Sequence, residues 1–462
     1  MVVREEKVKK KIAVIICNWN KKDDVIKCIH SVLQTSNHQL FDLYIVDNAS
    51  TDGSVEAIRE IYSQEEVVII RNKENLGGSG GFNKGISAVL DKDYKYIMLL
   101  DNDVYVDKNS IDELFDYMEE NQMVAAVGSK LYLQNRPGYL QEFGSFIDWE
   151  NFNNSPMFKN EIDSHIIPTE IECDYIPACS VMIRSSVIKE IGLMNESCFI
   201  YWDDIEWFYR MKRKGYKIIV NSKSKAWHKM GSANRSTTFP TYYFWRNRID
   251  FFLRYIQEDQ LDKFTKQIVS EMTRALFINN YNKTPNIGKT ILFALEDALS
   301  QKRGKALDDR IQIREQVDDH FEMFIEKRKN LLIYSNGQKK LLSILMERLA
   351  GKANVYMLKN DDLIDYIQSK DTSIKVLDKS VCSFSTINLM NHVLEIKPQK
   401  NSDFYIDNFL NMVDGSNYTE LLSSYHEWEE ISKNIYYPVL LQRFKEWRQL
   451  NSNSLLIERG VN

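Results

Sequence analysis

The sequence lacks the features of several protein classes. None of its apolar runs approaches the roughly 18 residues of a membrane-spanning helix, so we expect no transmembrane segment. The apolar stretch within residues 11–17 is too short for a signal peptide and runs straight into polar residues. The six cysteines form no CxxC pair and match neither a zinc site nor a disulfide scaffold. Together these absences predict a protein of the reducing cytoplasm.

A strong charge of either sign is also missing. The 462 residues include 60 Lys and Arg against 65 Asp and Glu, a formal net charge of -5. Such a balance argues against a nucleic-acid partner, whose binding depends on neutralising phosphates. At 44% hydrophobic residues the chain is typical of globular proteins, and its length suggests two or three domains.

Short apolar runs alternate with helical patterns in the first hundred residues, which predicts βαβ units and a mainly parallel sheet. Ligands of such sheets bind at the carboxyl ends of the strands, and polar clusters follow each run here. The runs are residues 11–16, 43–46, 66–70 and 94–100, and the clusters are residues 18–20, 47–54, 71–81 and 101–103.

The rest of the chain predicts two further segments. Residues 258–330 are charged and helical, and a second strand-helix alternation follows in residues 331–462. We expect a catalytic domain at 1–257, a helical extension at 258–330 and a small C-terminal α/β domain for interaction or assembly, which makes a homo-oligomer an expectation. The later strands are predicted at residues 331–335, 354–359, 374–378 and 392–396.

Asp101 and Asp103 follow a predicted buried strand. Because side chains alternate along a strand, both carboxylates are expected on one side, where they suit a divalent cation that prefers oxygen ligands. A turn in which Asp and Asn cap backbone amides explains the same residues equally well. His228, after the predicted strand at 216–220, is a candidate third ligand, although a lone histidine is more often structural.

Asp203 and Asp204 open a helical pattern. Asp203, with Glu206 three residues on, resembles a capping box, so its structural interpretation as an N-cap is favoured over catalysis. Asp204 lies in the first turn near tryptophans at 202, 207 and 227, and an aromatic pocket should raise its pKa, as suits a general base.

A glycine-rich stretch spans residues 75–85. It lacks the lysine of a Walker A loop and is not a clean GxGxxG. Glycine lets a backbone approach a ligand closely, and a loop of this kind at the start of a helix can bind phosphate. A tight turn is the alternative.

In this order, the segments IICNWN, VDNASTDGS, NLGGSGGFNKG, DND, WDD and WH resemble a family-2 glycosyltransferase of the GT-A fold over about residues 11–257. The WDD and WH pair, with TYYFWRNRIDFF at 241–252, resembles the branch of galactofuranosyl- and rhamnosyltransferases. The QxxRW signature of processive synthases is missing, which favours the addition of one or a few sugars.

The resemblance implies roles for individual residues. Asp204 is the implied base, and Asp101, Asp103 and His228 are the implied ligands of Mn²⁺ or Mg²⁺. The implied donor-binding residues are Asn18, Asp47, Asn75, Gly77, Gly81, Asn83, Asp101 and Arg246, with Gly80 and Gly85 in the same motif. Arg246 could stabilise the leaving phosphate or pair with a surface carboxylate, and Asn247 accompanies it. Asp174, Trp202 and Asp203 are candidates for the acceptor side.

We therefore expect an inverting, metal-dependent transfer from a nucleotide diphosphate sugar, with UDP-galactofuranose favoured, to a glycan or polyprenyl-linked acceptor in cell-surface polysaccharide biosynthesis. A dTDP-rhamnose donor, a sugar nucleotidyltransferase and an inactive scaffold are alternatives. Residues 17–25 lack the glycines of a nucleotidyltransferase loop, and a scaffold leaves the acidic residues unexplained.

Basic clusters at 302–305 and 326–330 suggest peripheral contact with the inner face of the membrane as one interpretation. A helix face exposed to solvent is the favoured interpretation of both clusters.

Overall fold

The structure is a computed structural model that describes most of the chain. It divides into two compact units that interleave in sequence: unit 1 comprises Met1–Phe264, Thr290–Ile313 and Arg443–Asn462, and unit 2 comprises Thr265–Lys289 and Arg314–Gln442. The predicted helical extension at 258–330 is thus shared between the units. The described residues are 10–229, 236–316, 320–335, 337–357, 374–376, 383–394, 402–408 and 410–452.

Unit 1 is built on a ten-stranded sheet in which the first four predicted strands are present. The order β10-β12-β6-β11-β4-β1-β2-β3 places β1 between β4 and β2, with β1, β2, β3 and β4 parallel. The strands are β1 Ile12–Asn18, β2 Phe41–Asp47, β3 Val67–Arg71, β4 Tyr96–Asp101, β5 Val104–Val106, β6 Val124–Leu133, β7 Arg136–Glu142, β10 Glu170–Glu172, β11 Ser180–Arg184 and β12 Lys217–His228.

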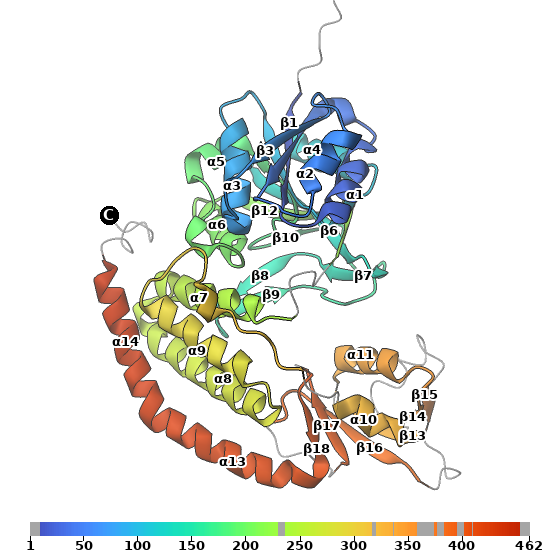
Figure 1. Cartoon of the computed structure of the whole chain (residues 1–462), viewed down its shortest axis with the longest axis vertical. Coiled ribbons are helices and arrows are strands. Elements are labelled where there is room, and N and C mark those ends of the chain that lie inside the picture. Colours follow the sequence, from blue (N-terminus) through green and yellow to red (C-terminus); the bar gives the residue numbers. More distant parts are fainter. Residues whose placement is uncertain are drawn as a thin grey trace, which may run out of the picture. The chain divides into compact units, whose positions relative to one another are not determined.

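Helices cover both faces of this sheet (Figure 1). The apolar residues of α1, α2 and α4 pack with Ile12, Val14 and Ile16 of β1 in one core, while α3 packs on the opposite face of β1 and β2. This alternation along β1 explains its unbroken apolar sequence, because a parallel sheet is buried on both sides. The helices are α1 Lys22–Leu33, α2 Ser54–Ile61, α3 Gly77–Val89, α4 Ser110–Glu120, α5 Ser185–Ile191 and α6 Asp203–Arg213.

An aromatic helix, α7 (Phe239–Tyr255), continues unit 1, and a hairpin of β8 (Ser145–Asp148) and β9 (Asn153–Pro156) lies in the same unit. The basic cluster at 302–305 also belongs to it. Lys302 pairs there with Asp297 and Arg303 with Asp250, so these two cations are engaged within the protein. The helices α8 (Leu261–Tyr281) and α9 (Pro285–Leu299) have residues in both units.

Unit 2 has a six-stranded sheet of order β15-β14-β13-β16-β17-β18, parallel except for β18. The predicted strands at 331–335, 354–359 and 374–378 correspond to β13, β14 and β15, although residues 358–359 and 377–378 lie outside the described part. The elements are α10 His320–Glu326, β13 Asn330–Tyr334, α11 Lys339–Leu349, β14 Asn354–Met357, β15 Ile374–Val376, β16 Ser385–Met390, β17 Phe404–Asp407, β18 Met412–Asp414 and α13 Tyr418–Ile431.

The predicted strand at 392–396 is wrong in its described residues. Val393 and Leu394 form a turn after β16, and their side chains are buried in a cluster with Tyr405 and Tyr418. A short apolar run fits a buried turn as well as a strand, because periodicity over three residues carries little information. Residues 395–396 lie outside the described part.

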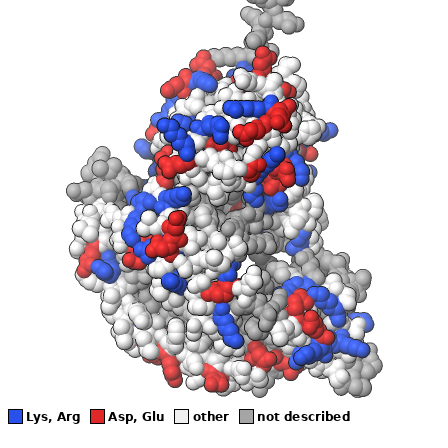
Figure 2. Space-filling model, in the orientation of Figure 1, with Lys and Arg blue, Asp and Glu red and all other residues white. Residues whose placement is uncertain are grey.

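No helix in the described part of the chain combines the length and the apolar character that a bilayer crossing requires. Lys and Arg alternate with Asp and Glu over the face shown in Figure 2, in keeping with the balanced composition.

Candidate active site

Three side chains predicted as metal ligands meet at the carboxyl edge of the unit 1 sheet. Asp101 is the last residue of β4, Asp103 precedes β5, and His228 is the last residue of β12, which pairs with β5 at that point. The His228 Nε2 atom lies 3.2 Å from Asp103 Oδ1 and 4.0 Å from Asp101 Oδ2. One ligand atom of each residue lies within 4.8 Å of the others. The two aspartates thus lie together as predicted, but Asn102 and Asp103 form a turn after β4, so the predicted strand alternation is not the cause.

The second ring nitrogen of His228 is held by Gln141 of β7. His228 Nδ1 and Gln141 Oε1 are 2.8 Å apart, and Gln141 is buried. Since the amide oxygen only accepts, this bond places a proton on Nδ1 and leaves Nε2, which faces the two aspartates, as the ring nitrogen that could bind a metal. Burial lowers the pKa of His228, but the Asp103 and Asp101 carboxylates outweigh it and raise that pKa above its ordinary value.

Asp204 lies in the first turn of α6, where its carboxylate accepts hydrogen bonds from the backbone N–H groups of Ile205 and Ala178, at 2.8 and 3.4 Å. Burial and the neighbouring Asp203 carboxylate raise the pKa of Asp204 to about 8. Burial raises the pKa of Asp203 to about 6. The predicted rise for Asp204 is present, and its cause is burial plus a second carboxylate.

The predicted capping box at Asp203 is wrong. Trp202 occupies the N-cap position in a left-handed conformation, without a side-chain capping bond, and Asp203 is the first helical residue. The carboxylate of Glu206 accepts hydrogen bonds from Arg210 and Tyr255. The sequence pattern of a capping box depends on the N-cap backbone being extended, and the φ of 66° at Trp202 removes that geometry.

The tryptophans near Asp204 in sequence have other contacts. The buried Trp202 ring packs against Phe244, Phe251 and Phe252, so it is a core residue, and the structure gives no support to its predicted acceptor role. Trp207 donates a hydrogen bond to the Gly192 carbonyl. Trp227 stacks on Tyr132, with ring centroids 5.4 Å apart.

The segment before α6 is unusual, because Phe199, Tyr201 and Trp202 all have positive φ. Two residues of α7, Arg246 and Asn247, bind backbone carbonyls of this segment. The Arg246 guanidinium donates to the carbonyls of Ser197 and Cys198, and to that of Gly304. The Asn247 amide lies within 2.9 Å of the carbonyls of Cys198, Ile200 and Tyr201. Strained backbone of this kind persists only where surrounding bonds fix it.

Arg246 was expected to contact the donor or a surface carboxylate. It is only 1% exposed, and its guanidinium donates hydrogen bonds to the three carbonyls and to the Asn247 side chain. The structure therefore assigns it the positioning of the loop that leads to Asp203 and Asp204. The RN pair was found from the sequence, but its bonding partners are 46–58 positions away and leave no local signal.

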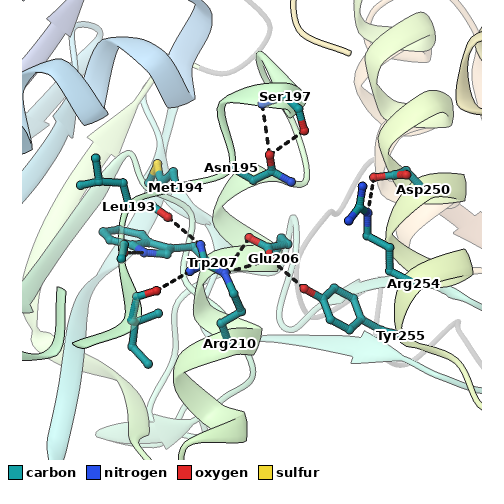
Figure 3. Close-up of polar contacts among 12 residues, drawn as sticks. Leu193, Met194, Asn195, Ser197, Glu206, Trp207, Arg210, Asp250, Arg254 and Tyr255 are labelled. Atoms are coloured by element: carbon teal, nitrogen blue, oxygen red, sulfur yellow. Dashed lines mark hydrogen bonds and ion pairs between the residues drawn. The ribbon is translucent and has the colours of Figure 1, made fainter. Parts of the chain in front are cut away.

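A second polar cluster fixes α6 against α7 (Figure 3). Arg210 donates to both oxygens of Glu206 and to the carbonyls of Ile191 and Leu193, while Arg254 pairs with Asp250. A cavity of about 360 Å³ lies here, lined by Leu193, Asn195, Ser197, Glu206, Arg210, Arg254 and Tyr255. None of the predicted catalytic or metal-binding residues lines it, and Arg210 is fully engaged with protein atoms.

Asp47 and Asn18 lie at the carboxyl ends of the neighbouring strands β2 and β1. Asp47 is buried; its Oδ2 atom accepts from the Ser50 N–H and lies 3.9 Å from Arg71, whereas no described residue bonds its Oδ1 atom. Asn18 accepts a hydrogen bond from Asn102, the residue between the two metal-ligand aspartates. The nucleotide-binding candidates thus lie directly beside the metal cluster.

The glycine-rich stretch is mostly helix and not the predicted loop, since α3 begins at Gly77. A Cβ at Gly77 would lie 2.1 Å from the Phe199 carbonyl oxygen, and one at Gly81 would lie 2.3 Å from Cys17 Sγ. Asn83 bonds the backbone of Met194 and the side chain of Glu196, and Asn75 accepts from the Gly77 N–H. These residues therefore allow α3 to pack closely, a role that glycine spacing alone does not distinguish from ligand contact.

Asp174, predicted near the acceptor, is engaged with the protein on both oxygens. Its carboxylate pairs with Lys212 at 2.7 Å and accepts from the Ile147 N–H at 2.9 Å. These bonds tie β8 to α6, which is a structural role.

Comparison with known proteins decides the family. The profile of the family described as glycosyl transferase family 2 matches residues 13–191. The chain carries a family-2 glycosyltransferase domain. The match, together with the sheet topology, confirms the predicted GT-A fold. It contains Asn18, Asp47, Asp101 and Asp103, whereas Asp204 and His228 lie beyond its end, so their assignment depends on the geometry above.

Two curated relatives of this family-2 domain are similar over part of their length. Galactofuranosyltransferase GlfT2 of Mycobacterium tuberculosis is 25% identical over 39% of this chain and 31% of its own. The low-salt glycan biosynthesis hexosyltransferase Agl10 of Haloferax volcanii is 26% identical over 45% of this chain and 63% of its own. The chain thus spans less than two thirds of either relative. A crystal structure of GalNAc-T7 with UDP, GalNAc and Mn²⁺ superposes with a TM-score of 0.47 at 14% identity, over 58% of this chain and 52% of that one.

Proposed function

We propose that this protein is an inverting, metal-dependent glycosyltransferase that transfers a sugar from a nucleotide diphosphate donor to a glycan or polyprenyl-linked acceptor. The observation that carries the proposal is the cluster of Asp101, Asp103 and His228 beside the buried Asp47, with the partly buried carboxylate of Asp204 at the start of α6. This set supplies a cation site, a nucleotide contact and a base in one sheet edge.

The residues of the cluster fit Mn²⁺ or Mg²⁺. Two carboxylates and one imidazole match the ligand preferences of these ions, and Mn²⁺ accepts the imidazole more readily than Mg²⁺ does. Burial raises the pKa of Asp101 to about 6, and the neighbouring Asp103 carboxylate adds to the rise, although His228 opposes it. A bound divalent ion supplies positive charge that neutralises the leaving diphosphate.

We assign recognition of the donor nucleotide to the carboxyl ends of β1 and β2, beside the metal cluster. The unbonded Oδ1 atom of the buried Asp47 is suited to accept a hydrogen bond from a nucleobase N–H group. Because one relative is named a galactofuranosyltransferase, we favour UDP-galactofuranose as the donor, with dTDP-rhamnose second. Asn18, Asn75, Gly77, Gly81 and Asn83 are assigned to the donor side on the family resemblance, and Gly81 lets α3 approach Cys17 of β1 closely.

Asp204 is assigned the proton transfer. Its carboxylate takes the proton of the acceptor hydroxyl while that oxygen bonds to the anomeric carbon and the bond from this carbon to the diphosphate breaks. The nucleoside diphosphate leaves with the electron pair, and the anomeric configuration inverts. A pKa of about 8 makes the Asp204 carboxylate a stronger base than an ordinary aspartate.

The test is a thermal-unfolding panel of the full chain with UDP, dTDP, GDP or CMP, each with Mn²⁺ or with EDTA. A nucleotide at about 100 times its dissociation constant stabilises the fold by about 2.7 kcal/mol. We expect stabilisation by UDP, or by dTDP for a rhamnosyl donor, only with Mn²⁺, and the Asp103→Asn variant should abolish it. Stabilisation that is equal in EDTA would contradict the metal role, and the anomeric configuration of the product, measured by NMR, tests inversion.

A further inference from the structure

Asp203 is a buried carboxylate that the proposed mechanism does not use. It is the first residue of α6, directly before Asp204, and only 8% of it is exposed. The backbone N–H groups of residues 203 and 204 act on its carboxylate and lower its pKa against the effect of burial. No side chain in the described part of the chain donates a hydrogen bond to it. Because a carboxylate has about four acceptor positions, this buried group retains the capacity to bind a further donor.

The Asp203 carboxylate faces the first turn of α3. A Cβ placed on Gly78, the second residue of α3, would lie 3.7 Å from Asp203 Oδ2, and no atom of another segment would lie closer to it. The preceding Gly77 contacts the same segment, because a Cβ there would clash with the Phe199 carbonyl oxygen. Two adjacent glycines thus leave room for one heavy atom between α3 and the Asp203 carboxylate.

The start of α3 brings a free N–H group to this place. The first N–H groups of a helix have no partner within the helix and carry a partial positive charge. The Gly77 N–H donates to the Asn75 side chain, and the Ser79 N–H donates to the Phe199 carbonyl. Among the described residues, the N–H of the partly exposed Gly78 has no hydrogen-bond partner. A donor and an acceptor therefore lie next to each other without being bonded to each other.

This pair lies beside the residues assigned to the donor. The negative charge of Asp203 contributes to the raised pKa of the metal-ligand candidate Asp101. Asn48, the residue after β2, donates a hydrogen bond of 2.8 Å to the Gly77 carbonyl and so ties α3 to the end of that strand. The start of α3 is thus held between the nucleotide-binding strand ends and Asp203.

Asp203 and Asp204 face different neighbours. Successive residues of a helix point about 100° apart around its axis. The Asp204 carboxylate accepts from the Ala178 N–H, just before β11, whereas the Asp203 carboxylate faces Gly78 of α3. Two adjacent carboxylates are therefore available to two different parts of the reaction.

We propose that the Asp203 carboxylate and the Gly78 N–H together bind one hydroxyl group of the donor sugar and so select the donor. A hydroxyl both donates and accepts, so it can donate to Asp203 while it accepts from Gly78. The inference rests on the proposed function, because the sugar of such a donor is bonded directly to the diphosphate that the metal cluster would bind. It moves Asp203 from the acceptor side, where the sequence placed it, to the donor side.

The test is titration calorimetry of the full-length protein with Mn²⁺ and either UDP or UDP-galactofuranose, without acceptor. Asp203→Ala should raise the dissociation constant of UDP-galactofuranose by about tenfold or more, because a hydrogen bond to a charged group is lost, and should not weaken UDP binding. If the thermal panel selects dTDP, then dTDP and dTDP-rhamnose are the ligands.

Gly78→Ala is an independent variant that keeps the charge of Asp203. Its methyl group would make an ordinary contact with the carboxylate, so we expect the variant to fold. The methyl group would occupy the place of the sugar hydroxyl, so UDP-galactofuranose should again bind about tenfold more weakly while UDP binding is unchanged. Glu206→Gln is the matched control, because this α6 carboxylate is bonded by Arg210 and Tyr255, and it should affect the two ligands equally.

Deoxyfluoro analogues of the donor sugar identify the bound hydroxyl, because fluorine cannot donate a hydrogen bond. At one position of the sugar, fluorine should weaken binding to the natural protein by about tenfold and have little further effect in Asp203→Ala, since the two changes remove the same interaction. Additive effects at every position would overturn the inference.

The remaining outcomes separate this inference from the proposed function. Equal losses of UDP and UDP-galactofuranose affinity in Asp203→Ala would make Asp203 a structural residue. Unchanged donor affinity with a raised KM for the acceptor would return Asp203 to the acceptor side. Either result overturns the inference and leaves the proposed function standing. Absence of Mn²⁺-dependent binding of any nucleotide would overturn both.

Discussion

Both units place an aspartate and a histidine near the carboxyl ends of parallel strands, but the surroundings of the two pairs differ. In unit 1, His228 Nε2 lies 3.2 Å from Asp103. In unit 2, His392 Nδ1 lies 3.8 Å from Asp407, the last residue of β17. The pKa of His228 is raised by its carboxylates, whereas burial lowers the pKa of His392.

The difference lies in what the rest of the chain supplies. Asp407 accepts hydrogen bonds from the Val393 N–H and from the backbone and side chain of Asn411, and His392 Nδ1 accepts from the Leu394 N–H. Unit 2 thus satisfies its pair with protein donors. Unit 1 directs the ligand atoms at one another, and the described residues contain no other group of three such ligands. The carboxyl ends of strands can bind a ligand where their polar atoms have no partner within the protein.

The largest expected effect comes from a carboxylate that has no counterpart in unit 2. Asp204→Asn keeps the shape of the side chain but removes its basicity, so we expect the transfer rate to fall by about 10² to 10⁴. Nucleotide-dependent stabilisation should stay within twofold of the natural protein. Loss of nucleotide binding in a folded Asp204→Asn variant would instead place this residue at the donor.

Matched substitutions of Asp103 and Asp407 test whether the two pairs differ in function. Asp103→Asn should weaken Mn²⁺-dependent nucleotide binding by about 100-fold or more, because a charged ligand is lost. Asp407→Asn should leave that binding unchanged and lower the free energy of unfolding by about 1–3 kcal/mol, because the NH2 group that replaces one carboxylate oxygen cannot accept from the N–H groups around it. Titration calorimetry and denaturant unfolding of both variants measure the two effects, and equal effects on binding would show that the two pairs are not different in kind.

Gln141→Ala tests whether the orientation of His228 matters. Removing a partner that holds a metal-binding imidazole typically weakens metal affinity by about 10–100-fold. We expect this loss for Mn²⁺, measured by electron paramagnetic resonance of the free ion. Gln134→Ala, a glutamine change outside the cluster, is the matched control, and an unchanged affinity in Gln141→Ala would show that the aspartates alone position the ion.

The smallest effect is on stability and depends on pH. The pKa of Asp204 is about 8 in the folded protein and about 4 when unfolded, so between these values the folded state binds more protons. The stability of the natural protein therefore decreases as pH rises from about 4 to 8, and Asp204→Asn lacks this contribution. The melting temperature of the variant minus that of the natural protein should therefore increase steadily as pH rises over this range. A difference that is constant with pH would contradict the raised pKa.

Local sequence patterns predicted the elements of the catalytic edge well. The alternation of apolar runs and helical spacing identified β1 to β4, because burial on both faces of a parallel sheet requires such runs. Asp101 and Asp103 were expected to lie together because of strand alternation; they do lie together, but Asn102 and Asp103 form a turn between β4 and β5, so the turn and not a continued strand brings them to one place. The helix that follows Asp203 was also expected, although its N-cap was not, because the left-handed Trp202 is imposed by the loop that Arg246 and Asn247 hold.

The sequence by itself determined which segments are strands and helices, which faces are apolar and which side chains have the chemistry for a metal or a base. Only the tertiary structure decided which of those side chains are left for a ligand. Gln141 reaches His228 across 87 positions, Arg246 bonds the loop near 198, and Trp202 enters the core. Whether a polar atom is already satisfied depends on neighbours from distant segments, and a pattern of adjacent residues does not contain that information.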